Sequence, residues 1–141
     1  MKTSARNQFA GTISRIEHGT VNDEVELELA GGHKIIAMIT CASTQRLALA
    51  VGSSAIALVK ASSVILSTDE GIRFSTRNTL SGTVAAVKAG AVNAEVIIDL
   101  AGGNQVAAIV TLNSSEALGL TTGKPVTAIF KASSVILGVS A

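Results

Sequence analysis

The sequence predicts an all-β protein made of two tandem OB-type barrels, each with five strands and one short helix. Three observations carry this prediction: the chain repeats itself once, each copy shows mostly two-residue periodicity, and turn residues separate the periodic segments. An internal repeat is considered first, because each copy is expected to form the same structural unit. The composition is 48% hydrophobic but only 2% aromatic, so small aliphatic residues must build the core.

The repeat has an offset of 71 positions and runs without a gap, from Ser4 on Ser75 to Leu66 on Leu137. Its most conspicuous segment, KASSVIL, occurs unchanged at 60–66 and again at 131–137. The duplication predicts one module at 1–68 and a second at 75–141. A short polar linker, residues 69–74 within the segment STDEGIRF, is expected to join them.

The first three strands of each copy are predicted by alternation and by one turn. In the first copy we expect strands at Asn7–Ile16, Glu24–Leu29 and Lys34–Thr40. The letters EVELEL place glutamates on one face and apolar residues on the other, as in a half-buried strand. Gly31-Gly32 indicates a hairpin turn. A phosphate loop is disfavoured, because neither a helix nor the lysine and hydroxyl of a P-loop follows.

A short helix is expected between the third and fourth strands. In the second copy, the segment NSSEALGL offers Ser114 as its cap and Gly119 as its end. The fourth and fifth strands of the first copy are predicted at Ala55–Val59 and Ser63–Leu66. This order of elements is that of an OB-type barrel. Units of about 65 residues bury a marginal core, so the two should pack together and oligomerise.

The sequence contains no recognisable catalytic set. Cys41 is the single cysteine and its counterpart is a leucine, which favours a small apolar residue over a nucleophile or thiolate cluster. The two histidines, His18 and His33, are replaced by Ala89 and Asn104 in the other copy. Catalytic and nucleotide-binding motifs are absent from the sequence. We therefore expect that the protein is not an enzyme.

Nucleic acid and membranes are also disfavoured as partners. OB barrels that bind single strands use aromatic stacking platforms and a basic groove, whereas this chain has three aromatic residues and a net charge of +1. No apolar run approaches the roughly 18–20 residues that span a bilayer. The first residues, MKTSARNQF, lack the apolar region of a signal peptide. The cytoplasm is the expected location.

The polar residues that recur in both copies predict a site for a small anion. Arginine and lysine side chains only donate hydrogen bonds, and hydroxyl and backbone N–H groups donate readily. Small residues beside them let the backbone approach a ligand closely. Such a donor set matches a small tetrahedral dianion, since charge-assisted bonds are about twice as strong as neutral ones. The alternative is that Arg6 and Lys60 are exposed charges in ordinary surface ion pairs, which contribute little to stability. For each residue alone we favour this alternative. For the whole set, which returns at one offset, we favour the anion site.

Four segments, TSARNQFAGTI, GTVNDEVELEL, AMIT and LVKASSVIL, resemble the Mop, or molbindin, module. The resemblance covers residues 3–137, and its SARN and KASS elements are specific when they occur together at this separation. It implies an OB-type barrel that binds molybdate or tungstate. For a tandem pair it implies a cytoplasmic molybdate-binding protein that forms a homotrimer, with six modules around a three-fold axis and oxyanions between modules.

The resemblance implies two classes of molybdate site. The first lies at interfaces between modules: Ser4, Arg6, Lys60, Ala61 and Ser62 with Thr40 and Ser43 of a different module, and Ser75, Arg77, Lys131, Ala132 and Ser133 with Thr111 and Ser114. The second lies near the three-fold axis: Gly19, Val21, Asn22, Gly90, Val92 and Asn93. Thr76 departs from the alanine of SARN. Glu17 and His18 face Lys88 and Ala89 in the alignment, so the two ends of the axis should bind with different strength.

The favoured function is intracellular storage, buffering or homeostasis of molybdate. One alternative is a molybdate sensor that acts through a partner protein; a sensor normally carries a DNA-binding or transporter domain, which we do not expect here. Another alternative is a structural oligomer whose repeated polar groups only satisfy interface hydrogen bonds. Anion-dependent melting distinguishes binding from the structural alternative, because a ligand bound only by the folded state raises its stability.

Overall fold

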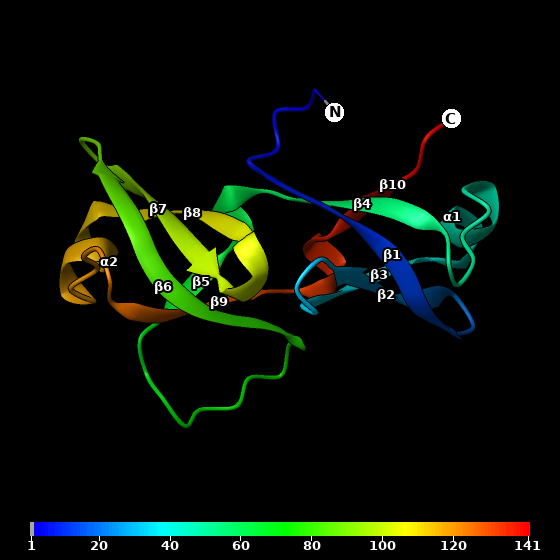
Figure 1. The fold of residues 1–141 in the computed structure, drawn as a ribbon, viewed down its shortest axis with the longest axis horizontal. Coiled ribbons are helices and arrows are strands. Elements are labelled where there is room, and N and C mark those ends of the chain that lie inside the picture. The colour runs from blue at the N-terminus through cyan, green and yellow to red at the C-terminus, as the bar shows by residue number, and fades with distance from the viewer. Residues whose placement is uncertain (1) are drawn as a thin grey trace.

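The computed structural model describes residues 2–141 and folds them into two curled five-stranded antiparallel sheets that lie side by side (Figure 1). The first copy contains β1 (Asn7–His18), β2 (Asn22–Leu29), β3 (Lys34–Thr40), α1 (Cys41–Arg46), β4 (Ser54–Val59), the 3-10 turn η1 (Ala61–Ser63) and β5 (Ile65–Ser67). The second copy contains β6 (Asn78–Ala89), β7 (Asn93–Leu100), η2 (Ala101–Gly103), β8 (Gln105–Thr111), α2 (Leu112–Ala117), β9 (Pro125–Phe130), η3 (Ala132–Ser134) and β10 (Ile136–Gly138). The all-β prediction, with one short α-helix per copy, is confirmed.

The two copies exchange their last strands. The sheet orders are β10-β4-β1-β2-β3 and β5-β9-β6-β7-β8, so β5 pairs with the second copy and β10 with the first. Leu66 lies opposite Ala128, and Leu137 lies opposite Ala57. The expectation that each copy supplies the fifth strand of its own barrel is therefore wrong, because the apolar half of KASSVIL belongs to the sheet of the other copy. The domain division at 1–68, 69–74 and 75–141 stays a prediction about units of the sequence. Each sheet combines four strands of one unit with the last strand of the other.

Alternation along each strand sends one set of side chains into the core. In β2 the residues Val25, Leu27 and Leu29 are buried, while the glutamates between them lie on the outer face. The exchanged strands alternate in the same way: Leu66 is 7% exposed, whereas its neighbour Ile65 is 63% exposed. The buried residues of both copies, including Phe9 and Phe130, form one continuous cluster. The strand exchange therefore gives the two sheets a shared core.

The helices begin one turn earlier than expected. Thr111, not Ser114, caps α2: the Ser114 N–H donates to the Thr111 Oγ1 at 3.1 Å. Thr40 and Ser43 make the same cap on α1. A residue with positive φ follows each helix, Gly119 at 61° as predicted and Ala48 at 51° in the first copy. Neither helix, nor any other within residues 2–141, is long and apolar enough to cross a membrane.

The hairpin turns predicted at the glycine pairs are confirmed, and they meet each other. Gly31 and Gly102 both have positive φ, and a Cβ on Gly31 would lie 2.7 Å from the Gly102 Cα. The Asn104 Nδ2 donates to the Ala30 carbonyl at 2.7 Å, and the His33 Nε2 lies 2.9 Å from the Ala101 carbonyl oxygen. His33 and Asn104 are thus matching contacts between the two copies.

Candidate anion site

Each KASS segment forms the entrance to a 3-10 turn. Lys60 is extended, with φ −65° and ψ 136°, and the turn bonds run from the Ser63 N–H to the Lys60 carbonyl and from the Val64 N–H to the Ala61 carbonyl. The N–H groups of Ala61 and Ser62 precede these bonds, as the first donors of a helical turn do. The turn η1 packs against β8 of the other copy, and η3 packs against β3. KASS therefore lies where the two copies meet.

The first hollow gathers five predicted residues of the first copy. A groove of about 410 Å³ is lined by Ser4, Arg6, Lys60, Ala61 and Ser62. Ile109, Ser134 and Ile136 close it from the second copy. Two cations and several neutral donors thus converge in a groove between modules. The SARN and KASS elements, which are distant in the sequence, therefore line the same groove.

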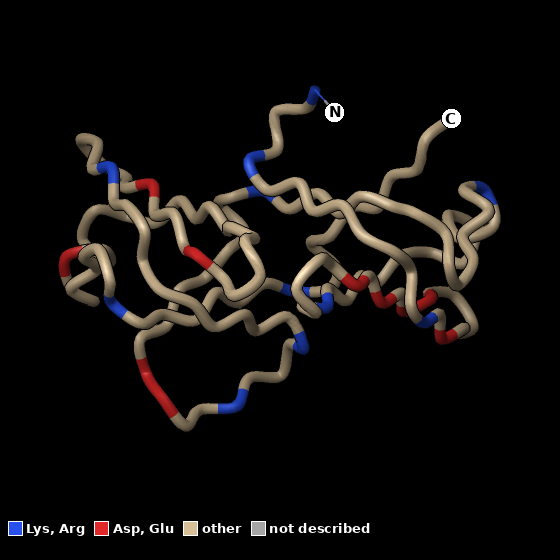
Figure 2. The backbone as a smooth tube through the Cα atoms, in the orientation of Figure 1, with Lys and Arg blue, Asp and Glu red and all other residues tan. Residues whose placement is uncertain are grey.

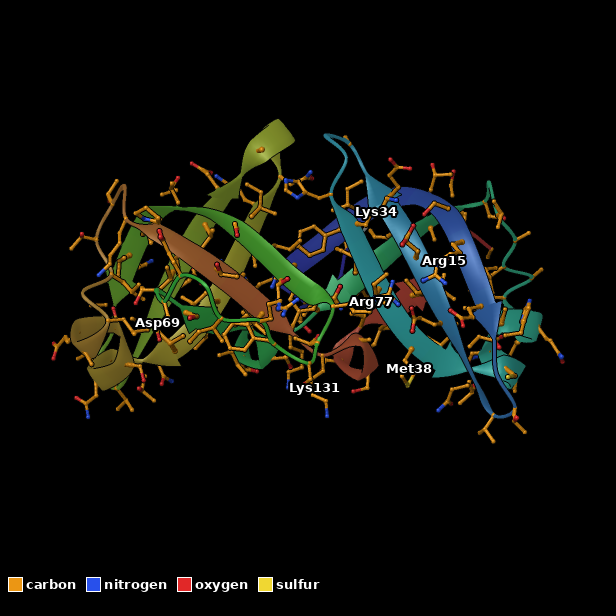
Figure 3. All side chains as sticks on the ribbon, turned by 90° about the horizontal axis from the view of Figure 1, so that it is seen from below. Arg15, Lys34, Met38, Asp69, Arg77 and Lys131 are labelled. Carbon is orange, nitrogen blue, oxygen red and sulfur yellow. The ribbon has the colours of Figure 1, made fainter. Side chains whose placement is uncertain are left out.

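The second hollow is the equivalent place in the other copy. A groove of about 700 Å³ is lined by Ser75, Arg77, Lys131, Ala132 and Ser133. Glu24 and Met38 of the first copy also line it. In Figure 3, Arg77 lies at the junction of the two sheets, near the strands of the first copy. Thr76 uses its added hydroxyl locally, by donating to the Phe130 carbonyl at 2.7 Å.

The predicted hydroxyl pairs are not part of these two hollows. Thr40 and Ser43 line a separate groove of about 400 Å³, together with Ser133 of the second copy. Thr111 and Ser114 line neither hollow. In both pairs the threonine hydroxyl donates to the serine Oγ at 2.8 Å and caps the helix. Within one chain these hydroxyls are helix caps, and only the pair Thr40 and Ser43 shares a groove with a predicted residue of the other copy, Ser133. That these pairs bind an anion stays a prediction.

Each arginine of the site pairs with a glutamate of the other copy. Arg6 donates to Glu95, and Arg77 donates to Glu24. The hydrogen bond and charge of Glu95 raise the pKa of Arg6, and the same hydrogen bond lowers the pKa of Glu95. Neither Lys60 nor Lys131 forms an ion pair within the described chain. The lysines are therefore the unengaged cations of the two hollows.

The asparagine of SARN has a role that the sequence did not reveal. Asn7 is 2% exposed; its Nδ2 donates to the Ala107 carbonyl at 2.8 Å and its Oδ1 accepts from the Ala107 N–H at 2.7 Å. Asn78 makes the same pair of bonds with Ile36. Both amides join a strand of one copy to the backbone of the other. They fix the SARN segments, and with them the arginines, at the junction. The available signal was a repeated asparagine at the start of a strand, where asparagine is disfavoured.

The loops predicted for the three-fold axis are exposed at their tips. Val21 and Val92 are 69% and 72% exposed, and their carbonyls accept from the Cys41 and Leu112 N–H groups. Gly19 and Asn22, like Gly90 and Asn93, lie on either side of these tips. Beside the first loop, Asp23 is 2% exposed and accepts from the Gly19 N–H at 3.2 Å and the Cys41 Sγ at 3.1 Å. Ala94 replaces Asp23 in the second copy. The second loop therefore has neither the negative charge of Asp23 nor the hydrogen bonds that Asp23 accepts beside the first loop.

The environment of Asp23 and Cys41 indicates a structural role for both side chains and not a reactive thiol. Hydrogen bonds from Thr44 and Cys41 lower the pKa of Asp23 to about 2, whereas the hydrogen bond to Asp23 and burial raise the pKa of the Cys41 thiol. A thiol with a raised pKa is a poor nucleophile at neutral pH. Across the described residues, no group of three or more His, Cys, Asp or Glu side chains is placed to hold a metal ion.

Known proteins resemble this chain over its whole length. The TOBE domain family matches residues 3–66 and 75–137. The molybdenum transport protein ModE of Herbaspirillum seropedicae is 46% identical over 140 residues, which are 99% of this chain and 52% of that protein. The molybdenum-pterin-binding protein MopA of Rhodobacter capsulatus is 47% identical over 141 residues, 99% of this chain and 53% of that one. The chain thus spans about half the length of these relatives.

A solved structure matches the full fold. The cytoplasmic molybdate-binding protein ModG, in a crystal form with molybdate bound, superposes with a TM-score of 0.96 and is 48% identical. The match covers 99% of this chain and 100% of that one. At this identity and coverage, the two proteins share the same overall fold.

Proposed function

Because the chain belongs to the TOBE-domain family in both of its copies, we propose that it binds molybdate, and tungstate as an ion of the same shape, for intracellular storage, buffering or homeostasis. The observation that carries this proposal is the convergence of Ser4, Arg6, Lys60, Ala61 and Ser62 in one groove between the copies. The molybdate-bound structure with the same fold supports the choice of ligand. We place the protein in the cytoplasm and assign it no enzymatic activity.

The grooves suit a tetrahedral dianion by their chemistry. Lys60 and Arg6 supply charge, and serine hydroxyls with the N–H groups of Ala61 and Ser62 supply neutral donors. Hydrogen phosphate carries a proton that needs an acceptor, and the groove of Arg6 and Lys60 has hydroxyls but no carboxylate in its described lining to accept it. Sulfate has no such proton, so it must be excluded by its smaller size.

The proposed site residues fall into two classes. Those at module interfaces are Ser4, Arg6, Thr40, Ser43, Lys60, Ala61, Ser62, Ser75, Arg77, Thr111, Ser114, Lys131, Ala132 and Ser133, and those near a three-fold axis are Gly19, Val21, Asn22, Gly90, Val92 and Asn93. Within one chain the hydroxyl pairs line neither of the two hollows, so a module of another chain would have to supply them. For that reason a homotrimer belongs to the proposal. Nucleic acid and membranes do not, since residues 2–141 offer three aromatic rings and little net charge.

Native mass spectrometry with molybdate, and in parallel with equal sulfate, tests the proposal. We expect discrete molybdate adducts on a trimer and none with sulfate. Arg6→Ala should lower the affinity or the number of bound anions, whereas Arg73→Ala, a linker substitution, should change neither. If the protein does not bind molybdate, the proposal is refuted and the repeated polar residues are interpreted as contacts between the copies. A monomer that binds molybdate would retain the ligand but refute the assembly.

A molybdate sensor is the second candidate. The similarity to ModE covers about half of that protein, which is compatible with a binding unit that passes its occupancy to other residues or to a partner. Retention of a partner protein only in the presence of molybdate would favour the sensor, while binding without any partner would favour storage.

A further inference from the structure

We propose that Glu24 and Glu95 compete with the oxyanion for the site arginines, each carboxylate holding the arginine of the opposite copy until the anion displaces it. The inference rests on the proposed function, because it concerns the same two grooves. It adds two residues that set the affinity of those grooves.

The two ion pairs are equivalent and lie across the junction. Arg6 of the first copy contacts Glu95 of the second, and Arg77 of the second contacts Glu24 of the first. Glu24 and Glu95 occupy matching positions of the repeat on β2 and β7. The arginine side chains are 50% and 53% exposed. Each arginine is therefore both reachable from solvent and already engaged.

A carboxylate and an oxyanion need the same donors. A guanidinium presents its N–H groups in one plane and binds carboxylates and tetrahedral oxyanions with the same fork. Glu24 itself lines the groove that contains Arg77 and Lys131. An anion that enters would lie beside this carboxylate, and like charges repel at such separations. Binding must therefore weaken the Arg–Glu pair, which lowers the apparent affinity of the groove.

Glu24 and Glu95 differ in the cations that stay near them once the anion has displaced them from the site arginine. The Glu24 Oε1 also lies 3.0 Å from the Arg15 Nη2, so Glu24 keeps an arginine when Arg77 turns to the anion. The counterpart of Arg15 is Ala86, and Glu95 has no second arginine within the described residues. Displacing Glu95 leaves that carboxylate with only the charge of Lys88, its neighbour on the adjacent strand β6, and no arginine among the described residues. We expect the Arg77 groove to fill before the Arg6 groove.

The charges along the two strands provide a matched control. Figure 2 shows acidic residues in a row on β2, of which Glu28 is exposed and has no ion pair in the described part of the chain. Glu28→Gln removes one negative charge from the same strand as Glu24 without freeing an arginine. It separates competition at the arginine from a general change in the protein's potential.

Isothermal titration calorimetry of the full chain with sodium molybdate tests the inference. The proteins compared are wild type, Glu95→Gln, Glu24→Gln and Glu28→Gln, with native mass spectrometry to count bound ions. Surface ion pairs are weak, so freeing the arginine should raise affinity by about two- to fivefold. We expect that gain for Glu95→Gln, a smaller gain for Glu24→Gln, and affinity close to wild type for Glu28→Gln.

The outcomes separate this inference from the proposed function. If wild type binds molybdate but Glu95→Gln binds no better than Glu28→Gln, the competition is refuted while the function stands. If wild type does not bind, the proposed function fails first and the inference with it. Should Glu95→Gln not fold by circular dichroism, Glu24→Gln carries the same test, and a gain no larger than that of Glu28→Gln would refute the proposal.

Discussion

Ala48 occupies a backbone conformation that the matching residue of the second copy adopts as glycine. Its φ is 51°, and Gly119 has a φ of 61° at the same place after the helix. A residue with a side chain in the left-handed region costs about 1–2 kcal/mol. Replacing it by glycine removes this cost but also raises the conformational entropy of the unfolded chain, so only part of the gain remains. Ala48 is exposed, so its methyl group contributes no core contact. We predict that Ala48→Gly raises the free energy of unfolding by about 0.5–1 kcal/mol, measured by urea denaturation.

The reverse substitution is the control for this prediction. Gly119→Ala should destabilise the protein, because the new methyl would adopt positive φ and lie 3.3 Å from the Lys124 Nζ. Equal stability of wild type and Ala48→Gly would show that the left-handed residue is not strained.

Asp23 should make the stability of the first copy depend on pH in the acid range. Its pKa in the folded protein is about 2, below the ordinary value of 3.8. A depressed carboxyl pKa stabilises the folded state above the unfolded pKa, and this contribution is lost as pH falls through the folded pKa. We predict that Asp23→Asn is less stable than wild type at pH 6 and that the difference shrinks between pH 4 and about pH 2.

Denaturation midpoints of both proteins across this range provide the measurement. Asp69→Asn, in the exposed linker, should show no such convergence. A gap between wild type and Asp23→Asn that stays constant down to pH 2 would contradict the assignment of the shift to folding.

At the scale of elements, the amides of Asn7 and Asn78 connect the two sheets. Asn78→Ala would leave the buried N–H and carbonyl of Ile36 without their partners. An unsatisfied buried group costs about 1–3 kcal/mol, so we predict a loss of roughly 2–4 kcal/mol in the free energy of unfolding. Thr79→Ala, at an exposed neighbouring position on β6, should cost far less. Similar losses for both substitutions would argue against the amide as the connecting group.

Most elements could be predicted from the sequence because their signals are local. Alternation in EVELEL and the glycine pair located β2 and its turn, and β3 was predicted with its observed bounds. The cap of α2 was misplaced because Thr111 and Ser114 both carry the hydroxyl that caps require. The partner of each KASSVIL strand could not be predicted, since the segment is identical in both copies and β4 and β9 offer equivalent edges.

The candidate site was predictable only in part for the same reason. Repetition identified the SARN and KASS residues, and the structure brings these together. Glu24 was interpreted only as part of the glutamate face of a half-buried strand, and Glu95 was not singled out, because nothing in an alternating strand shows which distant cation a glutamate meets. Arg6 and Glu95 are 89 positions apart, and Arg77 and Glu24 are 53 apart.

At the scale of the whole molecule, strand exchange makes each sheet depend on the other copy. Sheet order places β5 beside β9 and β10 beside β4 (Figure 1). If one sheet opened alone, it would release its exchanged strand, which is connected along the chain to the copy that forms the other sheet. Small units with little core of their own gain from this arrangement, because it merges two marginal cores into one. The two sheets should therefore open together.

Native-state hydrogen exchange on Leu66→Ala tests this coupling. Leu66 is buried in the sheet of the second copy although it belongs to the first, and truncating a buried leucine costs about 2–5 kcal/mol. If the sheets open as one unit, the slowest amides of β1 and of β6 should lose protection by the same factor. Ser67→Ala, on the same strand but only partly buried, should change both slightly. Protection lost in β6 alone would mean that exchanged strands join the sheets without making their unfolding cooperative.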